Sequence, residues 1–268
     1  MAELTQRDVA YEANGTRMIG CLVAPVGAAG DAAGAVASTL AAGCSAPRPG
    51  ILLVHDAFGL GADTIALAAR YAELGYAVFA ADVWGERTEP QSGVDIGRLI
   101  GSMAGDRDEW MSRLAAAHTA AAEQPEFDAD RTVVVGACFG GSSALEYVRT
   151  GARVIAAVSI HGGLDLVAHD WSAATGSATV LLCTGADDPM AAPEHWQPVK
   201  AGLTSAGIDW EFDLYSGTRH AFTNPKTDAL GMPGAAYHAR NAARAWARTV
   251  HFLGEVTGAA AGIRSGAR

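Results

Sequence analysis

Residues 132–141 read TVVVGACFGG, which is the most informative stretch of the sequence about its fold. Thr132–Val135 is a short apolar run, typical of a strand buried on both faces, and Ser142–Arg149 favours a helix. Between them, Cys138 stands in the Gly-x-nucleophile-x-Gly pattern. The small flanking residues let strand and helix meet at a sharp turn, which places the cysteine above the sheet at a helix N-terminus. The alternative interpretation is a glycine-rich packing turn around a buried structural cysteine.

Apolar strands and helices alternate on both sides of this turn. A hairpin around Asn14-Gly15 comes first, and residues 27–50, rich in alanine and glycine, suit a loop or insertion, whereas Gln91–Gly105 is ambiguous. The order predicts one α/β domain over residues 1–268, a mainly parallel central sheet with helices on both faces. We expect further strands at Ile51–Val54, Ala77–Ala81, Val154–Ile160, Thr179–Cys183 and Trp210–Tyr215, and further helices at Asp63–Leu74, Asp106–Glu123, Pro193–Ala206 and Ala235–Glu255.

The carboxyl ends of the late strands carry an acid and a histidine. Asp187 and Asp188 follow Thr179–Cys183, and His220 follows the last strand. The order cysteine, aspartate, histidine is that of α/β hydrolases. We predict Asp187 as the acid, because Asp188 precedes a proline and suits a turn, although both could be turn-formers alone. In this arrangement His220 deprotonates Cys138 and later protonates the leaving group.

Two backbone N–H groups are candidates for binding an oxyanion. They belong to Phe139, directly after the cysteine, and to Ala57, in the loop after Ile51–Val54. Asp56 in that loop would lie near the thiol, where a carboxylate keeps Cys138 protonated until a ligand intervenes. The alternative is that Asp56 caps a turn. His161, which follows another strand, is expected to make a structural hydrogen bond.

Composition excludes several classes of function. The formal net charge is −10, which argues against a nucleic-acid partner. The four cysteines are scattered without zinc spacing, as expected of free thiols in a reducing cytoplasm. No stretch is long and apolar enough to cross a membrane, and Met1–Ala10 is too polar for a secretory signal.

Taken together, these residues resemble the dienelactone hydrolase family from about Ile51 to about Leu253. The resemblance rests on Asp56-Ala57-Phe58-Gly59, Ala81-Asp82, the turn around Cys138, Gly185-Ala186-Asp187 and His220-Ala221-Phe222. It implies a Cys–His–Asp triad that cleaves an ester or lactone through a cysteinyl acyl-enzyme, with no metal and no cofactor. It also implies a thiol switch at Asp56, where the family typically has glutamate. The shorter aspartate puts that switch in doubt.

The resemblance leaves the substrate open. The family's carboxylate-binding arginine soon after the histidine is missing here, which puts dienelactone itself in doubt. Arg87 and Arg107 are candidates to replace it, although each suits a solvated surface charge. Phe58, Trp84 and Phe222 are candidates to line the pocket, and each could equally be core.

Several alternatives remain open besides a small-molecule ester or lactone as substrate. The same triad would serve a thioesterase, amidase or acyltransferase, and a non-catalytic ligand-binding protein could share the fold. The chain is expected to be a monomer or a homodimer.

Overall fold

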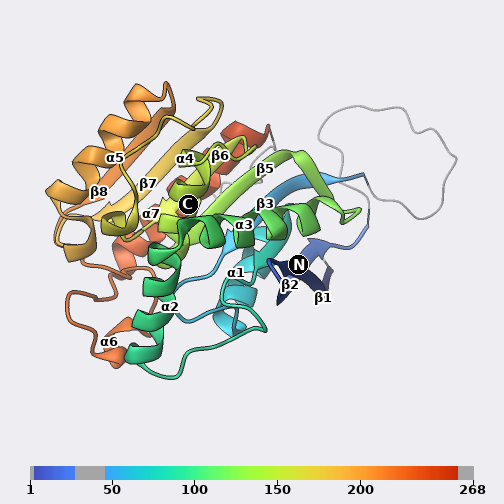
Figure 1. Cartoon of the computed structure of the whole chain (residues 1–268), viewed down its shortest axis with the longest axis horizontal. Coiled ribbons are helices and arrows are strands. Elements are labelled where there is room, and N and C mark those ends of the chain that lie inside the picture. Colours follow the sequence, from blue (N-terminus) through green and yellow to red (C-terminus); the bar gives the residue numbers. More distant parts are fainter. Residues whose placement is uncertain (1–2, 28–45, 259–268) are drawn as a thin grey trace, which may run out of the picture.

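The fold is built around one eight-stranded sheet (Figure 1). The structure, a computed structural model, describes residues 3–27 and 46–258 of the chain. The strands lie in the order β1-β2-β4-β3-β5-β6-β7-β8. Their bounds are β1 (Leu4–Ala13), β2 (Thr16–Pro25), β3 (Arg48–Val54), β4 (Ala77–Ala81), β5 (Phe127–Ala137), β6 (Ala156–Ile160), β7 (Thr179–Gly185) and β8 (Asp209–Tyr215).

The sheet is mainly parallel, as the sequence predicts. From β4 to β8 all neighbouring strands run parallel, whereas β2 pairs antiparallel with both β1 and β4. The predicted hairpin is formed by β1 and β2, with Asn14 and Gly15 both at positive φ in its turn. Because the parallel strands share one direction, their carboxyl ends meet at one edge, where the polar loops gather.

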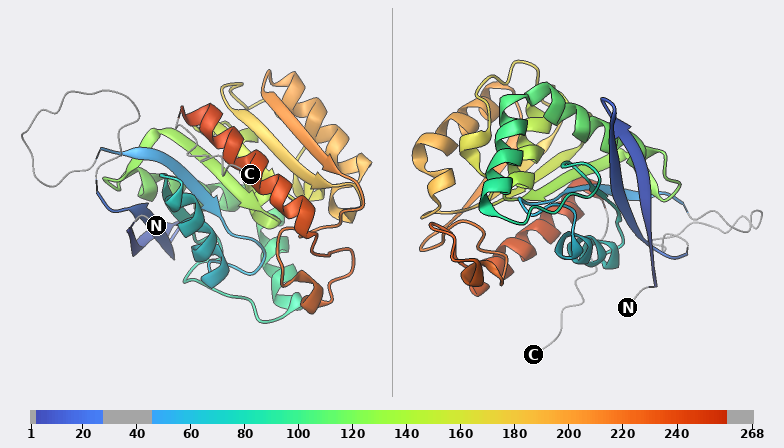
Figure 2. Two further views of the ribbon diagram at one scale, coloured as in Figure 1. Left: turned by 180° about the vertical axis from the view of Figure 1, so that it is seen from behind. Right: turned by 60° about the horizontal axis from the view of Figure 1, so that its bottom comes forward.

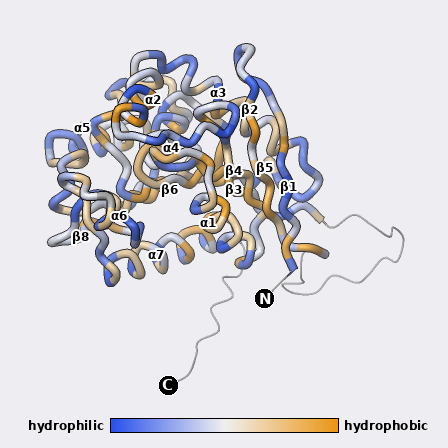
Figure 3. The backbone as a smooth tube through the Cα atoms, turned by 90° about the horizontal axis from the view of Figure 1, so that it is seen from below, coloured by the Kyte–Doolittle hydropathy of each residue, from blue (hydrophilic) through white to orange (hydrophobic). Residues whose placement is uncertain are grey.

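Helices cover both faces of the sheet, so two apolar layers are buried. α1 and α7 cover the face seen from behind in Figure 2, where Tyr71 and Phe252 are fully buried. α3, α4 and α5 cover the other face, around Trp110. Figure 3 shows hydrophobic residues concentrated in the central strands between these layers. The helices are α1 (Ala62–Glu73), α2 (Gly93–Gly105), α3 (Arg107–Ala122), α4 (Phe139–Arg149), α5 (Pro193–Ser205), α6 (Thr227–Leu230) and α7 (Ala239–Thr257), with 3₁₀ turns η1 (Leu164–Leu166) and η2 (Pro189–Ala191).

Some boundaries differ from those predicted. The ambiguous stretch is α2, whose N-terminus is capped by the Ser92 side chain accepting from the Asp95 N–H. Residues 48–50, assigned to the alanine- and glycine-rich loop, belong to β3, because Arg48 and Pro49 pair with β5. Residues 28–45 of that loop lie outside the described residues.

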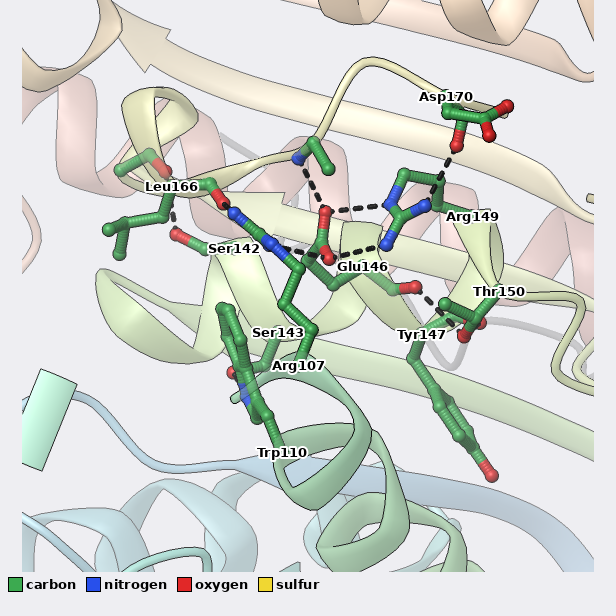
Figure 4. Close-up of polar contacts among 12 residues, drawn as sticks. Arg107, Trp110, Ser142, Ser143, Glu146, Tyr147, Arg149, Thr150, Leu166 and Asp170 are labelled. Carbon is green, nitrogen blue, oxygen red and sulfur yellow. Dashed lines mark hydrogen bonds and ion pairs between the residues drawn. The ribbon is translucent and has the colours of Figure 1, made fainter. Parts of the chain in front are cut away.

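A buried carboxylate ties α4 to its surroundings (Figure 4). Glu146 on α4 has no exposed surface and receives hydrogen bonds from Arg107, Arg149 and the Ala168 N–H at 2.7–2.8 Å. Arg107 also donates to the Leu166 carbonyl, so it joins α3, α4 and η1. A buried charge with this many donors fixes the position of the helix that follows Cys138.

Among residues 3–27 and 46–258, no helix is long and apolar enough to span a membrane.

Candidate active site

The turn at Cys138 has the strained geometry that its sequence predicts. Cys138 has φ 54° and ψ −121°, between the end of β5 and the start of α4. A Cβ atom on Gly136 would lie 2.1 Å from the Gly140 carbonyl oxygen, and one on Gly140 would lie 2.2 Å from that of Val54. Only glycine permits these approaches, which bring the end of β3 against the start of α4. The turn therefore projects a cysteine side chain beside the loop that follows β3.

His220 reaches this cysteine from the loop after β8. Its Nε2 atom lies 3.2 Å from Cys138 Sγ, and the imidazole is 1% exposed. The loop is held by backbone bonds from the His220 N–H to the Gly234 carbonyl and from the Ala236 N–H to the His220 carbonyl. The structure thus brings together two predicted site residues that lie 82 positions apart.

The acid beside His220 is Asp188, which corrects the prediction of Asp187. Asp188 Oδ2 lies 2.8 Å from His220 Nδ1, while Asp187 is exposed to solvent. Asp188 also shapes the turn, since its Oδ1 accepts from the Met190 N–H at 2.9 Å. Each carboxylate oxygen therefore has its own task, and the turn role assigned to Asp188 does not exclude the contact with the histidine. The end of β7 packs tightly against the Thr218 carbonyl, which sets Asp188 under His220.

The surroundings of His220 favour a protonated imidazole. Burial opposes the charge, but hydrogen bonds to Asp188 and Cys138 outweigh it and raise the pKa of His220 to about 10. The carboxylate fixes the tautomer by accepting from Nδ1–H, which leaves Nε2 facing the sulfur. This arrangement can hold the proton of the thiol and stabilise a thiolate.

The two backbone N–H groups predicted to bind an oxyanion belong to Phe139 and Ala57. Phe139 occupies the first position of α4, and Ala57 lies on the loop after β3. Within the described part of the chain, neither N–H meets a hydrogen-bond acceptor. The Cys138 N–H, by contrast, is engaged by the Ile160 carbonyl and by His161 Nδ1.

Asp56 lies on the wall of the same cavity as Cys138. Its Oδ1 accepts from the Phe58 N–H at 2.9 Å, so the carboxylate caps a turn, and burial raises its pKa. His55 braces this loop, since its Nε2 accepts from the Val83 N–H and its Nδ1 lies 2.7 Å from the Asp56 carbonyl oxygen. The turn cap and a position near the thiol are thus compatible.

A cavity of about 620 Å³ opens beside Cys138, His220 and Asp56. It runs between α1 and α7, where Tyr71 and Trp246 pack with ring centroids 5.0 Å apart. Phe58 lies on its wall, as predicted. The sequence did not indicate the walls from α1 and α7, because they arise from packing between distant segments.

Four other candidate pocket residues lie elsewhere. Trp84 is 5% exposed and packs on Phe139, and Phe222 is fully buried against Tyr215, so both are core residues and neither lines the cavity. Arg87 also lies away from it, bound to Asp8 of β1 at 2.6 Å, and Arg107 holds Glu146. The predictions of a pocket role for these four residues are wrong.

His161 makes the structural hydrogen bond that the sequence predicts, but with a member of the site. Its Nδ1 lies 3.1 Å from the Cys138 backbone nitrogen, and its Nε2 lies 2.8 Å from Thr223 Oγ1. Its ring stands edge-on to His220, with centroids 5.4 Å apart. No local motif marks this role, and only the adjacency of β5 and β6 in the sheet reveals it.

Comparison with protein families gives an extended match. Residues 36–257 match the model described as the dienelactone hydrolase family. Among curated proteins, the chain is 25% identical over 218 residues to a putative carboxymethylenebutenolidase of Salmonella typhimurium, covering 78% of each chain.

Solved structures agree with this match. The dienelactone hydrolase-like promiscuous phosphotriesterase P91, from metagenomic libraries, is 33% identical, with a TM-score of 0.83 over 96% of this chain and 99% of that one. A putative dienelactone hydrolase from Klebsiella pneumoniae, 21% identical, shares the fold with a TM-score of 0.72 over 94% and 99% of the two chains.

Proposed function

Because this chain belongs to the dienelactone hydrolase family, whose members include hydrolases of esters and lactones, we propose that it cleaves a small ester or lactone through Cys138, His220 and Asp188. The observation that carries the proposal is the hydrogen-bonded series Cys138–His220–Asp188 at the wall of a cavity. A nucleophile, a base and an orienting acid in contact form the arrangement required for acyl transfer.

In the first half of the reaction, His220 Nε2 takes the proton of the Cys138 thiol. The sulfur then attacks the substrate carbonyl carbon, and the carbonyl oxygen becomes an oxyanion that the Phe139 and Ala57 N–H groups bind. The carbon–oxygen bond of the ester breaks as the intermediate collapses. His220 returns its proton to the departing alkoxide, which leaves an alcohol and a cysteinyl thioester.

In the second half, His220 takes a proton from water while the water oxygen attacks the thioester carbonyl. The second oxyanion occupies the same N–H groups, and its collapse releases a carboxylic acid and the thiolate. Asp188 accepts from His220 Nδ1–H and stabilises the imidazolium that forms twice. For a lactone, acid and alcohol remain parts of one product.

Asp56 is proposed to restrain the resting thiol. It shares the cavity with Cys138. A carboxylate at this wall disfavours a nearby thiolate until a bound substrate separates the two groups.

Turnover by wild type and Cys138→Ala tests the proposed chemistry. The substrates are p-nitrophenyl esters of increasing acyl length and unsubstituted small lactones, followed by p-nitrophenol release and by acid release in a pH-stat. We expect turnover by wild type and none by the variant, with unchanged circular dichroism since alanine fits the turn. Equal turnover by both proteins would refute the assignment of Cys138.

Hydrolysis of a phosphotriester is a second candidate activity. The likeness to the promiscuous phosphotriesterase P91 favours it. The same sulfur would attack phosphorus and displace an aryloxide that His220 protonates. Water deprotonated by His220 would then attack phosphorus and break the phosphorus–sulfur bond, which releases the phosphodiester and the cysteine sulfur. Diethyl p-nitrophenyl phosphate tests it, and turnover that survives Cys138→Ala would refute this route.

A further inference from the structure

The hydrogen bonds of His161 define its tautomer. The backbone N–H of Cys138 donates to Nδ1, so this nitrogen carries a lone pair and no proton. The ring is 3% exposed, and burial together with the nearby His220 holds the pKa of His161 well below its usual range. A neutral ring with a bare Nδ1 carries its proton on Nε2. His161 therefore donates from Nε2 to Thr223 Oγ1.

This donation fixes the direction of the Thr223 hydroxyl group. The oxygen accepts from His161, so its own proton points away from the imidazole. Within the described part of the chain, no acceptor takes that proton. Thr223 is half-buried on the wall of the cavity that contains Cys138 and His220. A hydroxyl donor is thus presented to whatever occupies the cavity.

The charged groups of the cavity indicate what this donor suits. Lys226 bonds both carboxylate oxygens of Asp63 at 2.7 Å, and Arg70 lies 3.9 Å from the ring centre of Trp246. Among the described residues, the lysine and the arginine on this wall are thus already engaged, and Asp56 adds a carboxyl group to the same wall. A neutral donor in these surroundings favours an uncharged ether, carbonyl or phosphoryl oxygen over a carboxylate.

We propose that Thr223 is a specificity-determining residue whose hydroxyl group donates to an uncharged oxygen of the substrate, and that His161 is the positioning residue that orients it. The inference rests on the proposed ester hydrolysis and names a substrate class for it: neutral esters with a second hydrogen-bond acceptor near the scissile group. His161 links this donor to the nucleophile, because the same ring accepts from the Cys138 N–H.

Two matched pairs of esters test the proposal. On the acyl side, p-nitrophenyl methoxyacetate and p-nitrophenyl butyrate differ by one ether oxygen in place of a methylene. On the alcohol side, 2-methoxyethyl butyrate and n-butyl butyrate differ in the same way. Each pair gives a ratio of kcat/KM, and comparing that ratio between wild type and variant removes the intrinsic reactivity of the esters.

Four variants complete the design. Thr223→Val removes the hydroxyl at nearly constant shape, and Thr223→Ser retains it. His161→Asn places an acceptor near the Cys138 N–H, tolerates the positive φ of 39° and loses the donor to Thr223. Thr119→Val is the control, because Thr119 is exposed on α3 and bonds only its own helix.

The expected result is a fall in the ratio for at least one pair. Thr223→Val and His161→Asn should each lower it roughly 3- to 10-fold, the range that one neutral hydrogen bond supports, while Thr223→Ser and Thr119→Val stay within about twofold of wild type. If Thr223→Val turns over the esters with both ratios unchanged, the inference about Thr223 is overturned while the proposed ester hydrolysis stands. A ratio that falls in Thr223→Val but not in His161→Asn would overturn the role of His161. Wild type inactive on all four esters would refute the proposed function, and the inference with it.

Discussion

Replacing Asp188 by asparagine tests the assignment of the triad acid. Asp188 is 2% exposed, and its two oxygens bond Met190 N and His220 Nδ1. In Asp188→Asn the amide oxygen stays with the Met190 N–H, because that donor needs an acceptor. The amide NH₂ group then faces His220 Nδ1 and donates to it. The proton of the imidazole moves to Nε2, where it points at the sulfur and blocks base catalysis.

The size of the effect follows from these contacts. Loss of one hydrogen bond to a charged group costs about 1.5–3 kcal/mol, or ~10- to 150-fold in rate. The inverted tautomer adds to this loss, and the corresponding change in a serine-protease triad costs about 10⁴-fold in kcat. We therefore expect kcat/KM of Asp188→Asn to fall between about 10²- and 10⁴-fold.

Asp187→Asn is the matched control, since Asp187 is the adjacent, exposed aspartate. It should retain kcat/KM within about twofold of wild type, as surface substitutions generally do. The assay is p-nitrophenyl ester hydrolysis, with unfolding midpoints measured for both variants. A loss in Asp187→Asn as large as that in Asp188→Asn would refute the assignment.

Three further predictions concern the thiol, the fold and the histidine. Asp56→Asn should speed alkylation of Cys138 by iodoacetamide severalfold, because a neutral amide does not oppose the thiolate, and an unchanged rate would remove the proposed restraint. Glu146→Gln should lower the free energy of unfolding in urea by about 3 kcal/mol, since two arginines lose a buried carboxylate, whereas exposed Glu123→Gln should change it by less than about 0.5 kcal/mol. Burial lowers the pKa of His220, but its hydrogen bonds outweigh burial and raise the pKa to about 10. The contribution of protonated His220 to the free energy of unfolding is therefore full below about pH 6.5 and is lost as pH rises through about 10. The difference in unfolding free energy between wild type and His220→Asn should therefore shrink over this range, and a constant difference would contradict the pairing.

The cysteine and the histidine of the site could be identified from the sequence because local geometry marks them. The glycines around Cys138 are required by approaches near 2 Å, and His220 follows the last strand of a regular alternation. The sequence could not identify Asp188 as the acid, because its position before proline indicates a turn-forming residue. Its carboxylate has two oxygens, so one can shape the turn while the other contacts His220. The mainly parallel sheet followed from the same alternation, whereas the order of the strands within it comes from the structure alone.

Residues whose roles depend on distant partners could not be assigned from the sequence. Arg87 looked free beside a strand end, but Asp8 of β1 binds it from 79 positions away. Trp84 and Phe222 turned out to be core, because aromatic side chains near a strand end can point to either side. The cavity between α1 and α7 arises only when these helices pack on one face of the sheet.

Intact-protein mass spectrometry can detect an acyl group on Cys138 when wild type and Cys138→Ala are mixed with a p-nitrophenyl ester and rapidly quenched in acid. Our account predicts that wild type gains the mass of one acyl group, that peptide mapping places it on Cys138, and that the variant gains none. An acyl group on another residue, or turnover by the variant without any adduct, would contradict nucleophilic catalysis by Cys138.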